Sequence, residues 1–202
     1  MKKGLLFIIS GPAGSGKGTV VKKILENHGE DIMLSISMTT RQPRPMERPD
    51  VDYYFVTKDT FRERIEKGQM LEYAEYNGNF YGTPKKEVLE NLENGKDVIL
   101  EIEVEGAMQV KSVFPEAVTV MLTPPDSKTL ENRLRGRGTE TEESVINRLN
   151  KAKIEITYLP RYDYSVINED GGVEKCAELI YSIMQAEHAR TVHTSHIIKE
   201  FE

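Results

Sequence analysis

A glycine-rich segment near the N-terminus constrains the fold of this chain more than any other feature. Gly11, Gly14 and Gly16 follow an apolar stretch at residues 4–10 and come just before Lys17, where a helix is expected to begin. Glycines let successive backbone N–H groups converge on anionic oxygens, and the first turn of the helix adds its positive end. A strand, a glycine loop and a helix in this order predict an α/β fold whose loop binds phosphate.

The residues around Lys17 indicate what this glycine loop (residues 11–19) would bind. The amine of Lys17 is expected to contact the β- and γ-phosphates of a nucleotide, with a nearby hydroxyl ligating Mg²⁺. The usual pattern has Ser or Thr directly after the lysine, whereas Gly18 stands there and Thr19 follows. Thr19 and Ser15 are both candidates for the metal-binding hydroxyl. The predicted ATP-binding residues of the loop are Gly11, Pro12, Ala13, Gly14, Ser15, Gly16, Lys17, Gly18 and Thr19.

Composition excludes several classes of protein. The formal net charge of -6 argues against a general nucleic-acid binder, because such proteins carry a basic surface. Cys176 is the single cysteine, which excludes an intramolecular disulfide and suggests a reducing compartment. No apolar run reaches membrane-spanning length. We therefore expect a cytoplasmic protein with no nucleic-acid partner and no membrane partner.

The remaining apolar pattern predicts a doubly wound core. Strands are expected at residues 5–9, 97–102, 117–122 and 164–167, with helices at 17–26 and 173–188. Two stretches do not fit this alternation and are interpreted as inserts. Thr139 and Glu142 form a capping-box pattern in the second insert. The predicted organisation is a core at 1–34, 84–125 and 161–202, an insert at 35–83, and a lid insert at 126–160.

The first insert is rich in arginine, tyrosine and hydroxyl side chains. Arg41 and Arg44 lie three apart in SISMTTRQPR (residues 35–44), and DYYF (52–55) and NFYGT (79–83) follow. Guanidinium groups bind phosphate through paired hydrogen bonds, and phenols add single donors. These segments indicate a second phosphate site. The alternative is a solvated loop with incidental arginines.

Taken together, these segments resemble those of guanylate kinases. The resemblance also includes LEIEVEG (residues 100–106) and RGRGTETEES (residues 135–144) followed by Arg148, so it covers nearly the whole chain. It implies a P-loop three-layer α/β/α fold with a parallel central sheet, a small α+β GMP-binding insert and a helical lid insert. The implied activity is ATP-dependent phosphorylation of GMP to GDP, and of dGMP to its diphosphate, with Mg²⁺ as cofactor.

The same resemblance implies roles for individual residues. The GMP pocket is expected to consist of Ser37, Arg41, Arg44, Tyr53, Glu72, Tyr81, Thr83 and Glu103. The expected catalytic residues are Lys17, Arg41, Arg137 and Arg148, and the expected metal ligands are Thr19 and Glu101. Asn168 resembles the position near the adenine base, with a plain turn residue as the alternative. Many guanylate kinases have aspartates at 101 and 103, and Glu105 could share the duties of these glutamates.

The chemistry of Glu72 supports its assignment to the base. A carboxylate accepts two hydrogen bonds from N1–H and the 2-amino group of guanine, whereas adenine offers an acceptor at N1 and has no amino group beside it. A buried carboxylate facing the wrong edge is penalised, so such a site rejects the analogue. The alternative is an exposed carboxylate on a strand.

Two other functions remain as alternatives. One is a P-loop kinase for another small phosphate acceptor, and the other is a guanylate-kinase-like module that binds phosphopeptides in the same cleft. Glu72 with Ser37 and Thr83 argues against the first, and the intact loop with Lys17 argues against the second. The sequence leaves open whether the protein is a monomer or a homodimer.

Overall fold

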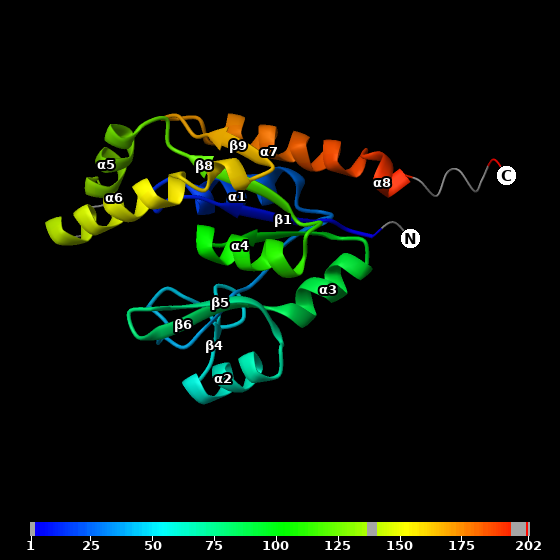
Figure 1. Cartoon of the computed structure of the whole chain (residues 1–202), viewed down its shortest axis with the longest axis horizontal. Helices are drawn as coiled ribbons and strands as arrows, with labels where there is room; N and C mark the ends of the chain where they lie inside the picture. Colours follow the sequence, from blue (N-terminus) through cyan, green and yellow to red (C-terminus); the bar gives the residue numbers. More distant parts are fainter. Residues whose placement is uncertain (1–2, 137–140, 195–200, 202) are drawn as a thin grey trace.

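A parallel sheet forms the centre of the protein, shown in Figure 1 as a computed structural model that describes residues 3–136, 141–194 and 201. Among these described residues the sheet has five strands in the order β2-β7-β1-β8-β9. The strands are β1 (Leu6–Ser10), β2 (Ile32–Leu34), β7 (Asp97–Glu101), β8 (Val118–Thr123) and β9 (Tyr164–Ile167). Because β1 pairs in parallel with both β7 and β8, the glycine loop that follows it begins in the middle of the sheet.

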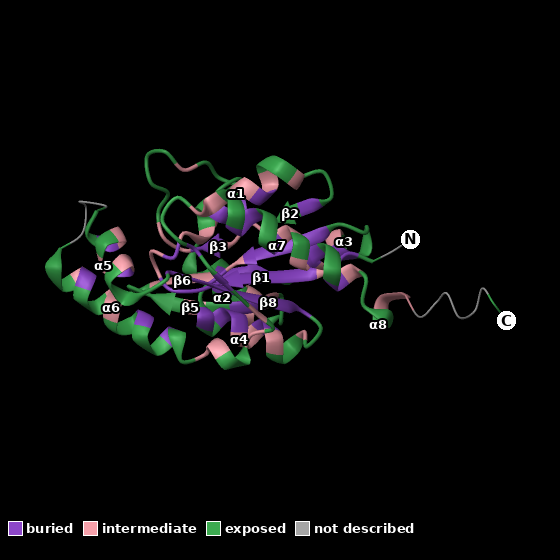
Figure 2. Cartoon of the chain, turned by 90° about the horizontal axis from the view of Figure 1, so that it is seen from above, coloured by how far each residue is buried: buried purple, intermediate pink, exposed green. Residues whose placement is uncertain are grey.

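Helices cover both faces of this sheet. One face is covered by α1 (Lys17–His28) and α7 (Val173–His188), and the other by α3 (Lys85–Glu93) and α4 (Val104–Val113). Side chains alternate along a strand, so Phe7 belongs to the first apolar core and Leu6 to the second. All five residues of β1 are buried, as expected of a central strand (Figure 2). This three-layer arrangement confirms the predicted fold class.

A second, mixed sheet lies beside the core. Within the described residues its order is β4-β3-β6-β5, and it lies below the core in Figure 1. Its elements are β3 (Met38–Thr39), β4 (Tyr54–Phe55), α2 (Lys58–Glu66), β5 (Met70–Tyr76) and β6 (Asn79–Pro84). The ring of Phe61 on α2 stacks on Phe80 of β6 with centroids 5.4 Å apart, which fastens α2 to the sheet.

Two helices project beyond the carboxyl edge of the central sheet. These are α5 (Ser127–Arg135) and α6 (Glu142–Ile156), which pack together through a small apolar cluster around Leu134 and Val145. The capping prediction for α6 was wrong. The N-cap of α6 is Thr141, whose hydroxyl accepts a hydrogen bond from Ser144 N. Thr141 carries the same capping hydroxyl as Thr139 and lies nearer the apolar part of the helix. Thr139 itself falls outside the described residues.

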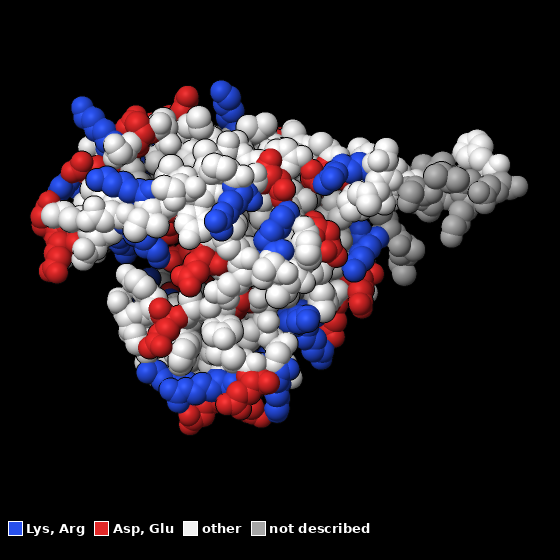
Figure 3. Space-filling model, in the orientation of Figure 1, with Lys and Arg blue, Asp and Glu red and all other residues white. Residues whose placement is uncertain are grey.

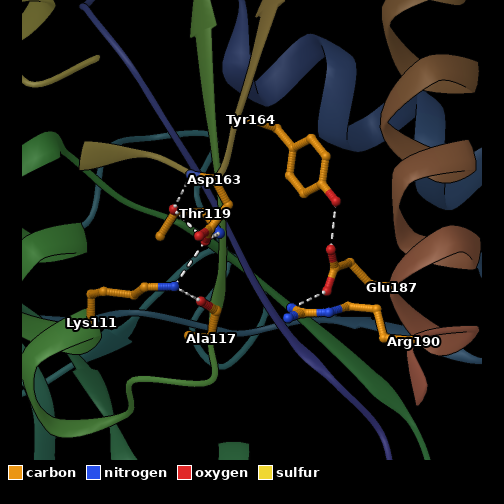
Figure 4. A network of polar contacts seen from close by, with 7 residues as sticks. All are labelled: Lys111, Ala117, Thr119, Asp163, Tyr164, Glu187 and Arg190. Carbon is orange, nitrogen blue, oxygen red and sulfur yellow. Dashed lines mark hydrogen bonds and ion pairs between the residues drawn. The ribbon is translucent and has the colours of Figure 1, made fainter. Parts of the chain in front are cut away.

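A polar network holds β9 against its neighbours (Figure 4). The carboxylate of Asp163, just before β9, accepts hydrogen bonds from the backbone N–H and hydroxyl of Thr119 at 2.9 and 2.8 Å. Lys111 Nζ, on α4, donates to the same carboxylate at 2.8 Å. Tyr164 donates to Glu187 on α7. These bonds fix the strand that leads to Asn168, beside the glycine loop.

Two short elements complete the described fold. They are η1 (Leu159–Arg161), between α6 and β9, and α8 (Thr191–Thr194), after α7. Across the residues that the structure describes, no helix is both long enough and apolar enough to span a bilayer.

Candidate active site

Two cavities open at the carboxyl edge of the central sheet. The phosphate-loop cavity, of about 320 Å³, is lined by Ala13, Gly14, Gly16, Lys17, Gly18, Thr19 and Glu101. The insert cavity, also of about 320 Å³, lies between the core and the second sheet, where the space-filling view is hollowed (Figure 3). Glu101, at the end of β7, lines both cavities. Ligands in the two cavities would therefore meet at Glu101.

The glycine loop has the backbone geometry that its sequence predicts. Gly11 and Gly16 have φ angles of 148° and 93°, which L-residues with side chains rarely adopt. A Cβ at Gly11 would also lie 2.1 Å from the carbonyl oxygen of Leu122. Helix α1 begins after Gly16 without a side-chain cap, so its first N–H groups and positive end are available to an anion.

Lys17 lies over this loop. Its Nζ donates to the carbonyl oxygens of Gly11 at 2.7 Å and Pro12 at 3.3 Å. Burial lowers the pKa of Lys17 from its ordinary value, and the nearby carboxylate of Glu101 opposes that shift. A phosphate group in the cavity would favour the charged amine in the same way.

Asn168 supports the loop from behind. Its side-chain Nδ2 donates to the carbonyl oxygen of Ser15 at 2.8 Å, and a Cβ at Gly16 would lie 2.5 Å from the same Nδ2. Arg133 of α5 donates to the carbonyl oxygen of Asn168 at 2.8 Å and forms an ion pair with Asp170. The structure therefore places the Asn168 side chain against the glycine loop and connects α5 to the segment that holds it.

The oxygen atoms around Gly18 suit a magnesium ion. Both carboxylate oxygens of Glu101 would lie 3.4 Å from a Cβ at Gly18, and Thr19 is exposed on the same turn of α1. The hydroxyl of Ser15 is buried and has no hydrogen-bond partner among the described residues. Mg²⁺ prefers oxygen ligands and usually takes one or two carboxylates together with substrate phosphates. This donor set fits a metal held largely by a nucleotide.

Glu72 is the buried carboxylate of the insert cavity. It lies on β5, is 7% exposed, and its Oε1 accepts a hydrogen bond from Thr83 Oγ1 at 2.7 Å. Burial raises the pKa of Glu72 to about 7, although the hydrogen bonds from Thr83 favour the ionised form. Thr83 is 1% exposed and stands behind Glu72 rather than in the cavity wall.

Arginine and tyrosine side chains gather at the other end of the insert cavity. Arg41 donates two hydrogen bonds to Glu47, at 2.6 and 2.7 Å, and the backbone N–H of Arg44 donates to the same carboxylate at 2.8 Å. The guanidinium of Arg41 lies 5.1 Å from the ring centre of Tyr53, which meets Tyr81 edge-on. These hydrogen bonds lower the pKa of Glu47 to about 2. Arg41 thus already shows the bidentate geometry with which it would bind a phosphate.

Most of the residues expected in the nucleotide pocket line this cavity. They are Ser37, Arg41, Arg44, Tyr53, Glu72, Tyr81 and Glu103. Glu47 also lines the cavity and was missed in the sequence. Its only signal is a carboxylate three residues after Arg44, which in a segment without periodicity does not indicate contact.

Comparison with known proteins agrees with this geometry. A model of the guanylate kinase family matches residues 3–187. The chain belongs to the guanylate kinase family. The guanylate kinase of Lactococcus lactis subsp. lactis is 53% identical over 189 residues, which cover 94% of this chain and 91% of the relative. The guanylate kinase of Oceanobacillus iheyensis is 51% identical over 189 residues, covering 94% and 90%. The crystal structure of guanylate kinase from Anaplasma phagocytophilum superimposes with a TM-score of 0.75 at 34% identity, covering 94% of this chain and 89% of that one.

The family resemblance assigned Glu103 to the nucleotide pocket, and the structure adds a partner for it. Glu103 is the N-cap residue of α4, and its carboxylate accepts a hydrogen bond from Lys151 of α6. The same amine lies 5.8 Å from the ring centre of Tyr76 on β5. Lys151 therefore connects α6 to both walls of the insert cavity. Its 48-residue separation from Glu103 left no local signal in the sequence.

The arginines of the segment at 126–160 differ in their surroundings. Arg148 lies on α6, whereas Arg137 falls outside the described residues. Arg135 pairs with Glu131 and Glu142 at the surface. Arg133 faces the segment at 168–170, as described above. Arg135 therefore links α5 to α6, and Arg133 links α5 to the core segment that contains Asn168.

Proposed function

We propose that this chain transfers the γ-phosphoryl group of Mg·ATP to GMP, and to dGMP, giving ADP and the nucleoside diphosphate. Membership of the guanylate kinase family and relatives 51–53% identical over 94% of the chain support phosphorylation of GMP. The observation that carries the proposal is that Glu101 lines both cavities. A nucleotide on the glycine loop and another beside Glu72 would direct their phosphates toward the same carboxylate.

The donor side consists of the glycine loop and α1. Backbone N–H groups of the loop and Lys17 would hold the β- and γ-phosphates of ATP, and Asn168 would keep the loop in place from behind. Glu101 and either Thr19 or Ser15 would hold Mg²⁺. When bound, the metal supplies positive charge between the phosphate oxygens.

The acceptor side is the insert cavity. Glu72 would accept hydrogen bonds from N1–H and the 2-amino group of guanine, with Ser37 and Glu103 beside the nucleoside. Thr83 would orient Glu72 through the hydrogen bond described above. The phosphate would be held by Arg41, Arg44, Tyr53 and Tyr81. To bind it, Arg41 would have to break its hydrogen bonds to Glu47.

Transfer needs alignment and positive charge more than covalent help from the protein. The phosphate of GMP is an anionic nucleophile at neutral pH, so no general base is required. Arg137 and Arg148 would neutralise the equatorial oxygens of the moving phosphoryl group when the lid insert at 126–160 and the insert at 35–83 close on the core. Closure would also exclude water that could otherwise hydrolyse ATP.

A compound in which adenosine and guanosine are joined through five phosphates tests the two-cavity arrangement. We expect it to bind at least about tenfold more tightly than ATP or GMP alone, because the second contact becomes intramolecular. The matched control joins two adenosines through five phosphates and should lose the contribution of Glu72. Equal calorimetric affinities for the two compounds would contradict a guanine site beside Glu101.

A further inference from the structure

Gly106 lies directly beneath the carboxylate of Glu72. It is the third residue of α4 and lines the insert cavity. A Cβ built on Gly106 would lie 2.7 Å from Glu72 Oε2 and 3.2 Å from Glu72 Cδ. Real Cβ atoms do not approach a carboxylate oxygen so closely, so any other residue at 106 requires Glu72 to move.

Glu72 has little freedom to move away. Its other oxygen is held by Thr83 Oγ1 at 2.7 Å. The next residue, Tyr73, is fastened to α4 because the side-chain amide of Gln109 both donates to its carbonyl oxygen and accepts from its N–H, each at 3.1 Å. Since Gln109 is on the same helix as Gly106, strand β5 cannot simply withdraw from the first turn of α4.

We propose that Gly106 is a positioning residue for guanine selection, because only a glycine at this place lets α4 and β5 close around Glu72 with its carboxylate at the cavity wall. This inference rests on the proposed role of Glu72 in binding guanine. Gly106 has no side chain with which to bind the base or the phosphate. Its contribution is the space that it leaves.

The backbone gives no other reason for a glycine here. Gly106 does not have a positive φ, and it lies within a helix, where alanine is usually more favourable than glycine. A purely structural account therefore predicts that Gly106→Ala stabilises the protein and leaves its substrate preference unchanged. Displacement of Glu72 predicts the opposite for selectivity.

The test compares Gly106→Ala with the wild-type enzyme on GMP and on inosine monophosphate, whose base has N1–H but no 2-amino group. We expect kcat/KM for GMP to fall at least about tenfold, mainly through KM, since one charge-assisted hydrogen bond is lost or weakened. The preference for GMP over inosine monophosphate should fall with it. Ser112→Ala, on the exposed side of α4, is the control and should change neither quantity.

A double-mutant cycle with Glu72→Ala separates the inference from the proposed function. Once Glu72 is removed, adding Gly106→Ala should change kcat/KM for GMP by less than about twofold. If Gly106→Ala lowers the melting temperature, Glu72→Ala should restore it by removing the clash. Unchanged GMP preference in Gly106→Ala, or a stability loss that Glu72→Ala does not restore, would overturn the inference. A Glu72→Ala variant that still selects GMP would instead overturn the proposed guanine site.

Discussion

Replacement of Lys17 by methionine is expected to lower kcat at least about 10³-fold while the dissociation constant for GMP changes less than about twofold. The amine of Lys17 lies over the glycine loop and would neutralise the charge of the transferring phosphate, whereas GMP would bind in the insert cavity. Steady-state kinetics and calorimetric titration with GMP measure the two quantities separately. The expected pattern is loss of turnover without loss of acceptor binding.

Lys22→Met is the matched control for this variant. Lys22 lies on the same helix, its side chain is 79% exposed, and it pairs only loosely with Glu26 at 3.7 Å. It should leave kcat unchanged. Because Lys17 also holds the carbonyl oxygens of Gly11 and Pro12, the melting temperatures of both variants need to be compared. An equal loss of GMP binding in Lys17→Met would mean that the lysine serves the acceptor rather than the donor.

Glu72→Gln is expected to lower kcat/KM for GMP about 10²-fold or more. The amide keeps the size of the side chain but has one acceptor instead of two, so its NH₂ group would face a donor of the base without a partner. The measurement is kcat/KM with GMP at saturating Mg·ATP. Glu75→Gln, an exposed position on the same strand, is the control and should have no effect. Equal effects of the two substitutions would exclude Glu72 from the base site.

The pH dependence of GMP binding provides a second test of the role of Glu72. Burial raises its pKa to about 7 in the unliganded protein, and only the ionised carboxylate accepts both hydrogen bonds. GMP affinity should therefore rise about tenfold between pH 6 and pH 8 from this group alone. The phosphate of GMP also titrates near pH 6, but it does so equally in wild type and Glu72→Gln. The difference between the two profiles isolates Glu72, and parallel profiles would contradict the assignment.

The pH dependence of folding stability that comes from Glu72 is opposite in direction to the pH dependence of GMP binding. The pKa of Glu72 is higher in the unliganded folded protein than in the unfolded chain, so folding favours the protonated carboxyl. This contribution to the free energy of unfolding is complete below the ordinary pKa of a glutamate and is lost as pH rises through about 7. GMP would reverse the trend by hydrogen-bonding to the ionised form.

The parts of the fold that the sequence predicted best are those with continuous apolar signals. The bounds predicted for β9 and α7 match Tyr164–Ile167 and Val173–His188, because each has a regular apolar repeat that ends at polar residues. β2 was missed because it is a three-residue edge strand with two exposed residues. α4 was missed because it starts with alternating glutamates that continue the strand pattern of β7.

In the candidate site, too, residues with a local sequence signal were predicted and contacts between distant segments were not. Local motifs predicted the glycine loop and the arginine pair Arg41 and Arg44, since each lies in a short segment with recognisable chemistry. Glu72 was expected in the site only from the resemblance to guanylate kinases. The partners of these groups depend on contacts between distant segments, which a single sequence does not reveal. Thr83 faces Glu72 only because β5 and β6 pair in one register, and Lys151 reaches Glu103 only after α6 folds over the core. Arg137 remains a prediction, as it lies outside the described residues.

The most direct test of the whole account is release of ADP from Mg·ATP with each nucleoside monophosphate as acceptor. We expect rapid ADP release with GMP and dGMP, and values of kcat/KM with AMP, CMP and UMP that are at least about 10²-fold lower, because only guanine donates two hydrogen bonds to Glu72. With GMP as acceptor, product analysis should identify GDP in amounts equal to ADP. Faster turnover with AMP than with GMP, or binding of both nucleotides without any ADP release, would contradict the central claim.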